Sequence, residues 1–430
     1  MSKAYYQFEP YNVGRWIIWT LFALVLLLAP QVFTSNLSIS MLAQMGIAII
    51  ACLSYNLLLG QGGMLSFGHA VYSGLGSYVA IHTLLKVSAG TLAVPVSLIP
   101  LIGGVAGFFF AILFGYVTTK KSGTPFAMIT LGVGELVFAL SLMVSDFFGG
   151  EAGISANRVV GDPVLGITFG PAVQVYYLIA LYTFVCVAAM YAFTRTPLGR
   201  ILNAVRDNPE RVEFVGYNTQ VVRYLAFMIS GFFAGIAGGL GAIQFEIVTA
   251  EVVGPLRSGA YLLFTFLGGA TFFFGPIIGG VLMVLALVLL SELTKAWLLY
   301  LGLVFLFMVM YAPGGIAGLI MMNLRVAAFG RLRELWGSYL ALAVTGLVAL
   351  LGAGGVIEMV YHLQLNAAIG PEVQYLGATL DTRAVESWFG SVFVMLTGIG
   401  LFEVTRRRFR EHWSEIQIDI EKEIKRREMA

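Results

Sequence analysis

The chain has 430 residues, of which 59% are hydrophobic and only 11% are charged. Soluble globular proteins carry about 25% charged residues, so the composition excludes that class and indicates a polytopic membrane protein. The formal net charge of +2 is small and gives no indication of nucleic-acid binding. The two cysteines, Cys52 and Cys186, lie in separate apolar runs, so we expect neither a disulfide framework nor a cysteine-based metal site.

A bilayer core needs about 20 apolar residues for each helix that crosses it. Runs of this kind predict about twelve crossings, at residues 16–34, 41–60, 64–85, 92–118, 125–148, 172–193, 221–245, 259–275, 276–293, 296–313, 335–360 and 388–404. Lysines and arginines concentrate at 120–121, 194–223, 325–333 and after 406, and the positive-inside rule places these segments and both termini in the cytoplasm. The predicted fold class is an all-α polytopic membrane protein with about ten core transmembrane helices and two C-terminal helices.

Two of the predicted crossings are interrupted. The segment 60–77, GQGGMLSFGHAVYSGLGS, is rich in glycine, and each glycine disfavours a regular helix by about 1 kcal/mol relative to alanine. The segment 259–275 is short and ends in LGGATFFFG before Pro276. Each is third in its set of five crossings, in halves 16–148 and 172–313 of opposite orientation. This pattern predicts an inverted repeat whose broken helices line a central pathway, with chance placement as the alternative.

The segment 194–223 is the one long polar stretch between two strongly hydrophobic halves. Its five arginines would each cost about 2.5–3.5 kcal/mol at the bilayer centre, so we expect it in the cytoplasm. Thr196 and Asn208 each precede a proline and can cap a helix, which predicts two short helices with a stop near Gly216. Helical order with apolar surface indicates a docking surface. An ordinary basic loop that obeys the positive-inside rule is the alternative.

The candidate site residues form two groups. Those expected to contact a docking partner are Arg200, Arg206, Asp207, Asn208, Glu210, Arg211, Glu213 and Gly216. Those expected to line the pathway are Gly62, Gly63, Ser66, His69, Glu135, Gly268 and Gly269. Glu135 lies near the middle of a predicted crossing, which favours either solute contact or a hydrogen bond to an interrupted neighbouring helix. Ser66 and His69 lie in the glycine-rich break, where half-helix ends can meet a polar solute, and a packing role is the alternative for His69.

Nothing in the sequence indicates an enzyme. Ser66 and His69 have no convincing acid partner or oxyanion motif in their stretch, which argues against a hydrolase. No GxxxxGK[ST] motif occurs, so any ATP chemistry belongs to a partner. We therefore expect no catalytic residue, no metal site and no cofactor bound by this chain.

Five stretches carry a further signal: GQGGMLSFGHAVYSGLGSY at 60–78, TPFAMITLGVGEL at 124–136, FGGEAGIS at 148–155, TPLGRILNAVRDNPERVEFVGYN at 196–218 and LAFMISGFFAGIAGGL at 225–240. In this order and spacing they resemble the LivM-type permease subunit of bacterial branched-chain amino-acid ABC importers. The similarity covers roughly residues 16–320. The combination is specific, although each glycine-rich piece alone is a weak signal.

The resemblance implies a type II ABC importer-like permease in the bacterial inner membrane. Its expected partners are a second LivH-like permease subunit, two cytoplasmic ABC ATPase subunits that hold ATP and Mg, and a periplasmic substrate-binding protein. The segment 194–223 would be the coupling element that fits a cleft in an ATPase. Family members also move urea, short amides and aromatic or other carboxylic acids, so the solute stays open. Two features depart from the family: Glu135 is followed by Phe138 where an arginine is usual, and residues 321–430 have no usual counterpart.

These observations predict a permease core at 1–320 and a C-terminal extension at 321–430, with two transmembrane helices and a charged cytoplasmic tail. Isoleucines recur every four residues in the tail and are expected on a partner, on the membrane surface or in a solvated helix: Ile416, Ile420 and Ile424. The main alternative function is an ion-coupled secondary transporter of small solutes, and a passive channel is a third. Both leave the amphipathic central loop unexplained.

Overall fold

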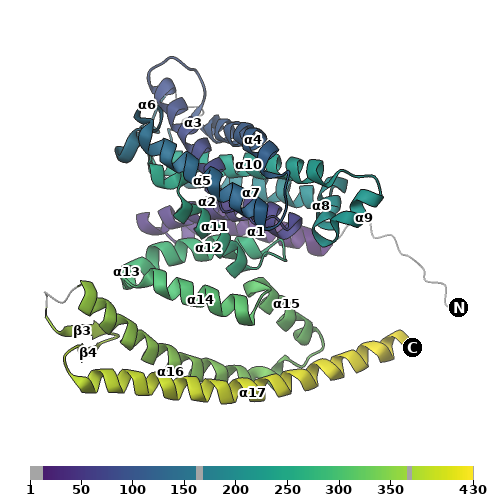
Figure 1. Cartoon of the computed structure of the whole chain (residues 1–430), viewed down its shortest axis with the longest axis vertical. Helices are drawn as coiled ribbons and strands as arrows, with labels where there is room; N and C mark the ends of the chain where they lie inside the picture. The colour runs from purple at the N-terminus through teal and green to yellow at the C-terminus, as the bar shows by residue number, and fades with distance from the viewer. Residues whose placement is uncertain (1–12, 161–167, 366–369, 430) are drawn as a thin grey trace. The chain divides into compact units, whose positions relative to one another are not determined.

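The structure is a computed structural model that describes residues 13–160, 168–365 and 370–429. Its helices are α1 (Val13–Val32), α2 (Asn36–Gly62), α3 (Ala70–Ser88), α4 (Ile99–Thr118), α5 (Thr124–Met143), α6 (Ser145–Phe148), α7 (Ala172–Arg195), α8 (Pro197–Asp207), α9 (Pro209–Phe214), α10 (Thr219–Phe245), α11 (Pro255–Gly268), α12 (Gly275–Val284), α13 (Ser291–Leu293), α14 (Trp297–Tyr311), α15 (Gly315–Ala328), α16 (Leu332–Leu365) and α17 (Val385–Met429) (Figure 1). Shorter turns are the 3₁₀ segments η1 (Val96–Leu98), η2 (Gly150–Ala152) and η3 (Ala250–Val253) and the π-helical η4 (Leu285–Leu290). The strands are β1 (Ile154–Ser155), β2 (Ile247–Val248), β3 (Glu372–Tyr375) and β4 (Ala378–Asp381).

The all-α prediction is confirmed, with two small exceptions. β1 and β2 pair antiparallel, with Ile154 opposite Val248, and β3 and β4 form a second antiparallel pair. Both pairs lie in connections between long helices. No strand was expected at these places, because two-residue and four-residue strands carry too little period-2 pattern to be recognised.

Within the described ranges, eight helices are long and apolar enough to cross a membrane, or nine if the bent pair α14 and α15 is one span. The twelve crossings predicted from hydropathy are therefore too many by this criterion. The crossings predicted at 64–85 and 259–275 reduce to α3 and to the 14-residue α11. Non-helical backbone takes up the rest of each predicted crossing, before α3 at 64–69 and after α11 at 269–274, and hydropathy alone does not distinguish such backbone from helix.

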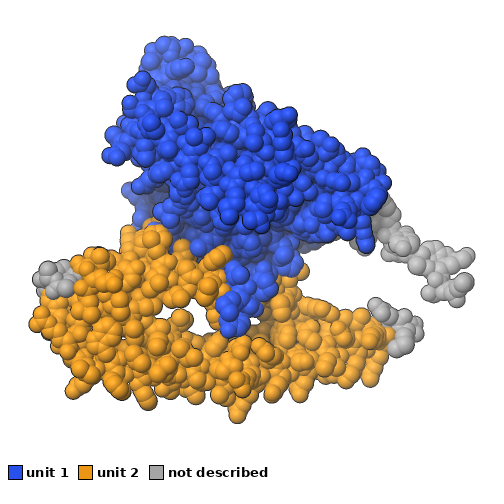
Figure 2. Space-filling model, in the orientation of Figure 1, with its two compact units in different colours: residues 1–287, 308–317 blue, residues 288–307, 318–430 orange. Residues whose placement is uncertain are grey.

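Contacts divide the chain into two compact units (Figure 2). Unit 1 comprises residues 1–287 and 308–317, and unit 2 comprises residues 288–307 and 318–430. Segment 288–307 precedes residue 320 and so falls within the permease core predicted at 1–320. Its contacts nevertheless group it with the C-terminal extension in unit 2.

The core of unit 1 depends on a close approach of α4 and α10. Gly103 and Gly107 lie one turn apart on α4, and Gly231 and Gly235 lie one turn apart on α10. A Cβ added at Gly235 would overlap the carbonyl oxygen of Gly103, and one added at Gly107 would overlap that of Gly231. In membranes, small residues four positions apart let two helix backbones approach closely. These glycines therefore set the distance between α4 and α10.

Arg158 ties the connection between α6 and α7 to the end of α10. Its backbone N–H donates to Oε1 of Glu246 at 2.8 Å, and its guanidinium donates to the carbonyls of Phe169 at 2.8 Å and Gly170 at 3.1 Å. The β1–β2 pair joins the same two segments. We call this part of unit 1 the β-pair end. The helices α8 and α9 lie at the opposite end of unit 1 from α6 (Figure 1), and we call that the α8–α9 end.

Unit 2 is built on the helices α16 and α17, which lie side by side. Ile416 and Ile420 of α17 are buried in a cluster with Val326 and Leu335, and Ile424 packs against that cluster. The expectation that these isoleucines face a partner, the bilayer or solvent is therefore wrong. They contact α15 and α16 of the same unit, because the tail continues α17 without a break and stays alongside those helices.

Glu358 is an acid in the apolar helix α16, and the sequence pattern around it does not indicate its role. The hydroxyls of Thr294 and Tyr300 both donate to its Oε1, the latter at 3.2 Å. A carboxylate removed from water is stable only when donors of this kind compensate it. Glu358 therefore joins α16 to the segment 288–307 of unit 2.

The two ends of unit 1 provide a topology test. Single cysteines at Asn218, beside α9, and Asp146, in α6, are expected to react with an impermeant maleimide from opposite sides of the membrane, because both positions are exposed at opposite ends of the unit. The native Cys52 and Cys186 are buried and should stay unlabelled. Labelling of both new cysteines from one side would contradict the topology.

Candidate functional site

The central polar segment folds into two short helices, as predicted. α8 follows Thr196, whose Oγ1 accepts a hydrogen bond from the Gly199 N–H at 3.2 Å. α9 follows Asn208, whose Oδ1 accepts from the Arg211 N–H at 3.0 Å. Both side chains satisfy backbone donors that the first turn of a helix leaves free. The local sequence is thus sufficient to explain where each helix begins.

One side of α8 packs into unit 1. Leu202 and Val205 are buried in a cluster that includes Leu58 of α2 and Phe227 of α10, and Met64 completes it. Burying a leucine or valine side chain contributes about 1.5–3 kcal/mol. The helix is therefore part of the core at the α8–α9 end rather than a loose loop.

The other side of α8 and α9 is open. The predicted docking residues that are exposed are Arg200, Arg206, Asp207, Glu210, Arg211, Glu213 and Gly216, and Asn208 is half-buried. The candidate set left out Phe214 and Val215, which are 89% and 75% exposed. These two adjacent apolar side chains extend the exposed surface formed by the predicted docking residues. Their apolar character was the available signal, but Val212 has the same character and is buried, so periodicity over six residues could not separate them.

The first helical break lies at residues 63–69, between α2 and α3, and confirms the predicted interruption. Gly63 has φ +65°, and the N–H groups of Gly63 and Met64 donate to the carbonyls of Leu59 and Leu58 at 3.0 and 2.9 Å. This is a glycine-terminated helix end, in which a side chain at Gly63 would be strained. The break is therefore specified by the sequence.

Arg206 joins α8 to this break. Its Nη1 donates to the carbonyl oxygen of Gly60 in the last turn of α2. Its aliphatic carbons lie against Gly63, and Leu202 of the same helix lies against Gly62. A cation near a helix C-terminus is favourable by about 0.3–1 kcal/mol. A displacement of α8 would thus act directly on the end of α2 and on the break.

Ser66 and His69 are completely buried in this conformation. His69 Nε2 lies 2.9 Å from Ser54 Oγ, and the Ser54 hydroxyl donates to the carbonyl of Ala51 at 2.7 Å. Because that bond uses the only hydroxyl proton of Ser54, His69 donates from Nε2 and keeps Nδ1 as an acceptor. Among the described residues, His69 Nδ1 and Ser66 Oγ have no hydrogen-bond partner. Such buried unpaired atoms cost about 1–3 kcal/mol each, so the break holds two unsatisfied polar groups.

The second predicted interruption follows α11. Gly269 has φ +114°, and Gly268 lies against the backbone of Gly275 at the start of α12. The carbonyl of Ala270 lies against Gly60 of α2. The structure therefore brings the backbone after α11 against the last turn of α2, next to the first break. That the two breaks line one pathway stays a prediction.

The Glu135 side chain does not contact either helical break. It lies on an exposed face of α5 and has no side-chain partner in the described part of the chain. Thr130 instead accepts the Phe67 N–H at 3.1 Å through its hydroxyl, and Gly134 lies against Gly68. The described residues therefore provide no hydrogen bond between Glu135 and the interrupted helix, and the alternative role of Glu135, contact with a solute, stays a prediction. Thr130 and Gly134 are four residues apart and share a helix face, whereas Glu135 points about 100° away from it.

The family model described as branched-chain amino acid transport system, permease component, matches residues 37–313. The chain is 27% identical over 314 residues to the high-affinity branched-chain amino acid transport system permease protein LivM of Salmonella typhimurium, with 68% of this chain and 72% of the relative covered. It is 27% identical over 296 residues to LivM of Escherichia coli, with 63% and 67% covered. It is 25% identical over 298 residues to the galactose/methyl galactoside import permease protein MglC of Escherichia coli, with 67% and 87% covered. No solved structure gives a significant match.

The matched residues include both helical breaks and the helices α8 and α9. Most of unit 2 lies outside it. The names of the relatives include both amino acids and sugars, so family membership does not define the solute. The match confirms the LivM-type resemblance: the chain belongs to the branched-chain amino acid transport system permease family, whose members are multi-pass membrane permeases of ABC importers and not enzymes.

Proposed function

We propose that this chain is the permease subunit of an ATP-driven importer for branched-chain amino acids or related small polar solutes. The observation that carries this proposal is the contact between α8 and the first break, where Arg206 bonds to Gly60 and Leu202 lies against Gly62. It connects an exposed docking surface to the segment that must rearrange when a solute passes. The two LivM relatives favour amino acids over the other solutes of the family.

The proposed partners follow from this role. Two cytoplasmic ABC ATPase subunits hold ATP and Mg, and one of them receives α8 and α9 in a surface cleft. A second LivH-like permease subunit completes the pathway, and a periplasmic binding protein delivers the solute at the β-pair end. The chain then lies in the bacterial inner membrane with both termini cytoplasmic, as the loop cations favour.

An inverted repeat within the core is part of the proposal, as in type II ABC importers. The helices α2 and α10 have 27 residues each, and each is followed by non-helical backbone and a shorter helix, α3 or α11. The first break lies at the α8–α9 end, whereas α10 finishes at the β-pair end. Equivalent elements of opposite orientation support a repeat related by an axis in the membrane plane.

An ion-coupled secondary transporter is less well supported. Such a transporter needs ionisable groups along its pathway. Glu135 lies on an exposed face of α5, away from the two breaks, and Glu358 is hydrogen-bonded within unit 2. This alternative also gives no role to the exposed Phe214 and Val215.

Phe214→Asp tests the proposed function. We expect the variant to lose stable association with the ATPase subunits. Stimulation of ATP hydrolysis by loaded binding protein should fall at least about tenfold, because truncating an aromatic anchor at an interface costs about 2 kcal/mol or more. Co-purification and ATP hydrolysis in proteoliposomes measure both effects. Leu376→Asp is the control, since Leu376 is similarly exposed at 76% on the β3–β4 turn. Unchanged association of the Phe214 variant would reduce α8 and α9 to an ordinary basic loop.

A further inference from the structure

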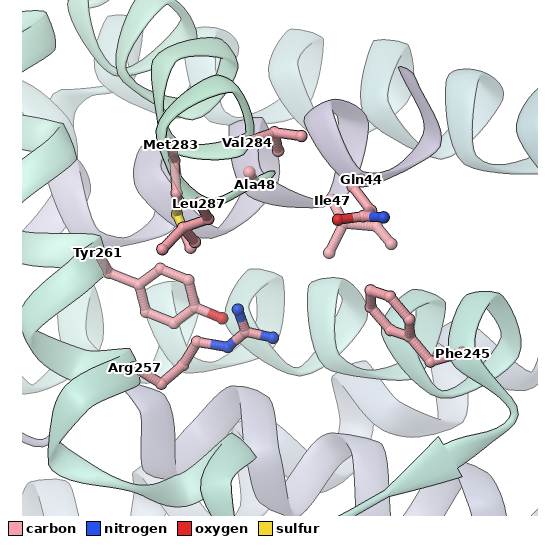
Figure 3. Close-up of a pocket in the computed structure, with 9 residues that line it drawn as sticks. All are labelled: Gln44, Ile47, Ala48, Phe245, Arg257, Tyr261, Met283, Val284 and Leu287. Carbon is pink, nitrogen blue, oxygen red and sulfur yellow. The ribbon is translucent and has the colours of Figure 1, made fainter. Parts of the chain in front are cut away.

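Unit 1 contains an open pocket that is separate from the two breaks. It lies between α2, α10, α11 and α12, and its empty volume is about 390 Å³ when the part open to the surroundings is included. Arg257 points into it beside Tyr261, with Phe245 on the facing wall (Figure 3). Phe245 is the last residue of α10 and Arg257 is in the first turn of α11, so the pocket lies toward the β-pair end.

The position of Arg257 is electrostatically unfavourable without an anion. It is the third residue of α11, where the partial positive charge at the start of a helix disfavours a cation by about 0.3–1 kcal/mol. No acid lines the pocket, and within residues 13–160, 168–365 and 370–429 no carboxylate pairs with its guanidinium. The helix start and the guanidinium together attract a negative group, and an arginine presents a planar fork that matches a carboxylate.

The remaining walls set the shape of the ligand. Met283 and Leu287 offer apolar surface opposite the cation, and Gln44 and Tyr261 offer neutral hydrogen-bonding groups. A pocket of this kind fits a molecule with an apolar body and an anionic end. A sugar or a nucleoside has no charge for Arg257 to pair with, and a purely cationic solute would be repelled.

We propose that Arg257 anchors the carboxylate of a small apolar solute, such as a branched-chain amino acid or a branched carboxylic acid. The inference rests on the proposed import function and names the solute class and the anchoring residue of the permease itself. A phospholipid headgroup has the same combination of anion and apolar chains, so the experiment must separate the two sources.

The test uses the full chain in nanodiscs of zwitterionic phosphatidylcholine and saturation-transfer NMR, which detects weak ligands. We expect binding of L-leucine and of 4-methylpentanoate, and no binding of leucinamide, which lacks the carboxylate. Arg257→Gln should weaken leucine binding about tenfold or more, because it removes a charge-assisted hydrogen bond, and Arg257→Lys should restore part of it. Lys86→Gln is the control, since Lys86 is an exposed cation on α3 that does not line the pocket. The melting temperature of each variant confirms that it is folded.

Three results would each overturn the proposal. The first is binding of leucinamide as tight as that of leucine, and the second is full leucine affinity in the folded Arg257→Gln variant. The third is that only the binding of phosphatidylglycerol depends on Arg257. Native mass spectrometry detects this lipid when the protein retains it. None of these measurements needs an ATPase or a binding protein. If Arg257 proves not to bind a carboxylate, the docking test with Phe214→Asp is unaffected. If the docking test fails, the ligand-binding test of Arg257 can still be interpreted.

Discussion

Gly235→Leu is expected to prevent unit 1 from folding. Even a single Cβ at this position would overlap the carbonyl oxygen of Gly103, which belongs to the backbone of α4 and cannot rotate away. Extra methylenes in a packed core cost about 1–3 kcal/mol and more where the neighbours cannot move. We expect no monodisperse protein after detergent extraction, measured by fluorescence-detected size-exclusion chromatography.

A pair of alanine variants on the same helix isolates the cause. Replacing glycine by alanine normally stabilises a helix by about 1 kcal/mol. A Cβ added at Gly241 would meet no atom of the described residues within 4 Å, so Gly241→Ala should raise the melting temperature or leave it unchanged. Gly235→Ala should lower it, because the same methyl group meets α4. Similar shifts of the same sign in both variants would show that the glycines do not set the helix distance.

Arg206→Gln is expected to uncouple transport from ATP hydrolysis in the assembled importer. The variant loses the bond to the Gly60 carbonyl and the charge at the end of α2, whereas Leu202 and Val205 still hold α8 in the core. Coupling free energies between sites are typically about 1–3 kcal/mol, or about 5–150-fold. We therefore expect solute uptake per ATP hydrolysed to fall by about tenfold, measured with both assays on the same proteoliposomes.

Two variants define the specificity of this effect. Arg206→Lys keeps a cation near the C-terminus of α2 and should restore much of the coupling. Lys120→Gln removes a cation that stacks on Tyr116, in the connection after α4, and should leave coupling normal. If Arg206→Gln hydrolyses ATP and imports solute in the normal ratio, the contact between α8 and α2 has no part in transmission.

Local signals in the sequence were sufficient for several features of the candidate site. Thr196 and Asn208 predicted the starts of α8 and α9, since a capping side chain acts within three residues of its own position. The glycines of segment 60–77 predicted an interruption there, and the structure shows its local cause, a left-handed Gly63 that ends α2. The number of crossings was predicted less well, since hydropathy measures apolar character and does not distinguish a helix from the non-helical backbone at 63–69.

Other features depended on contacts between distant segments. The burial of Val212 and the exposure of Phe214 follow from the way α9 meets the core, which a six-residue pattern cannot specify. The outward direction of Glu135 follows from the packing of Thr130 and Gly134 against the first break. Neither could be derived from residue type alone.

The sequence by itself thus determined that the chain is helical, that it crosses a membrane, that two of its helices are interrupted and that an ordered polar segment lies between its halves. These properties depend on composition, periodicity and caps, all of which act over short distances along the chain. Only the tertiary structure decided that Arg206 reaches Gly60, that Ala270 meets the same glycine and that Arg257 stands in a pocket beside Tyr261. The first two contacts join segments that are far apart in sequence, and the pocket lies between four helices. The geometry of all three features therefore depends on how closely the helices pack, which the glycines at their contacts set.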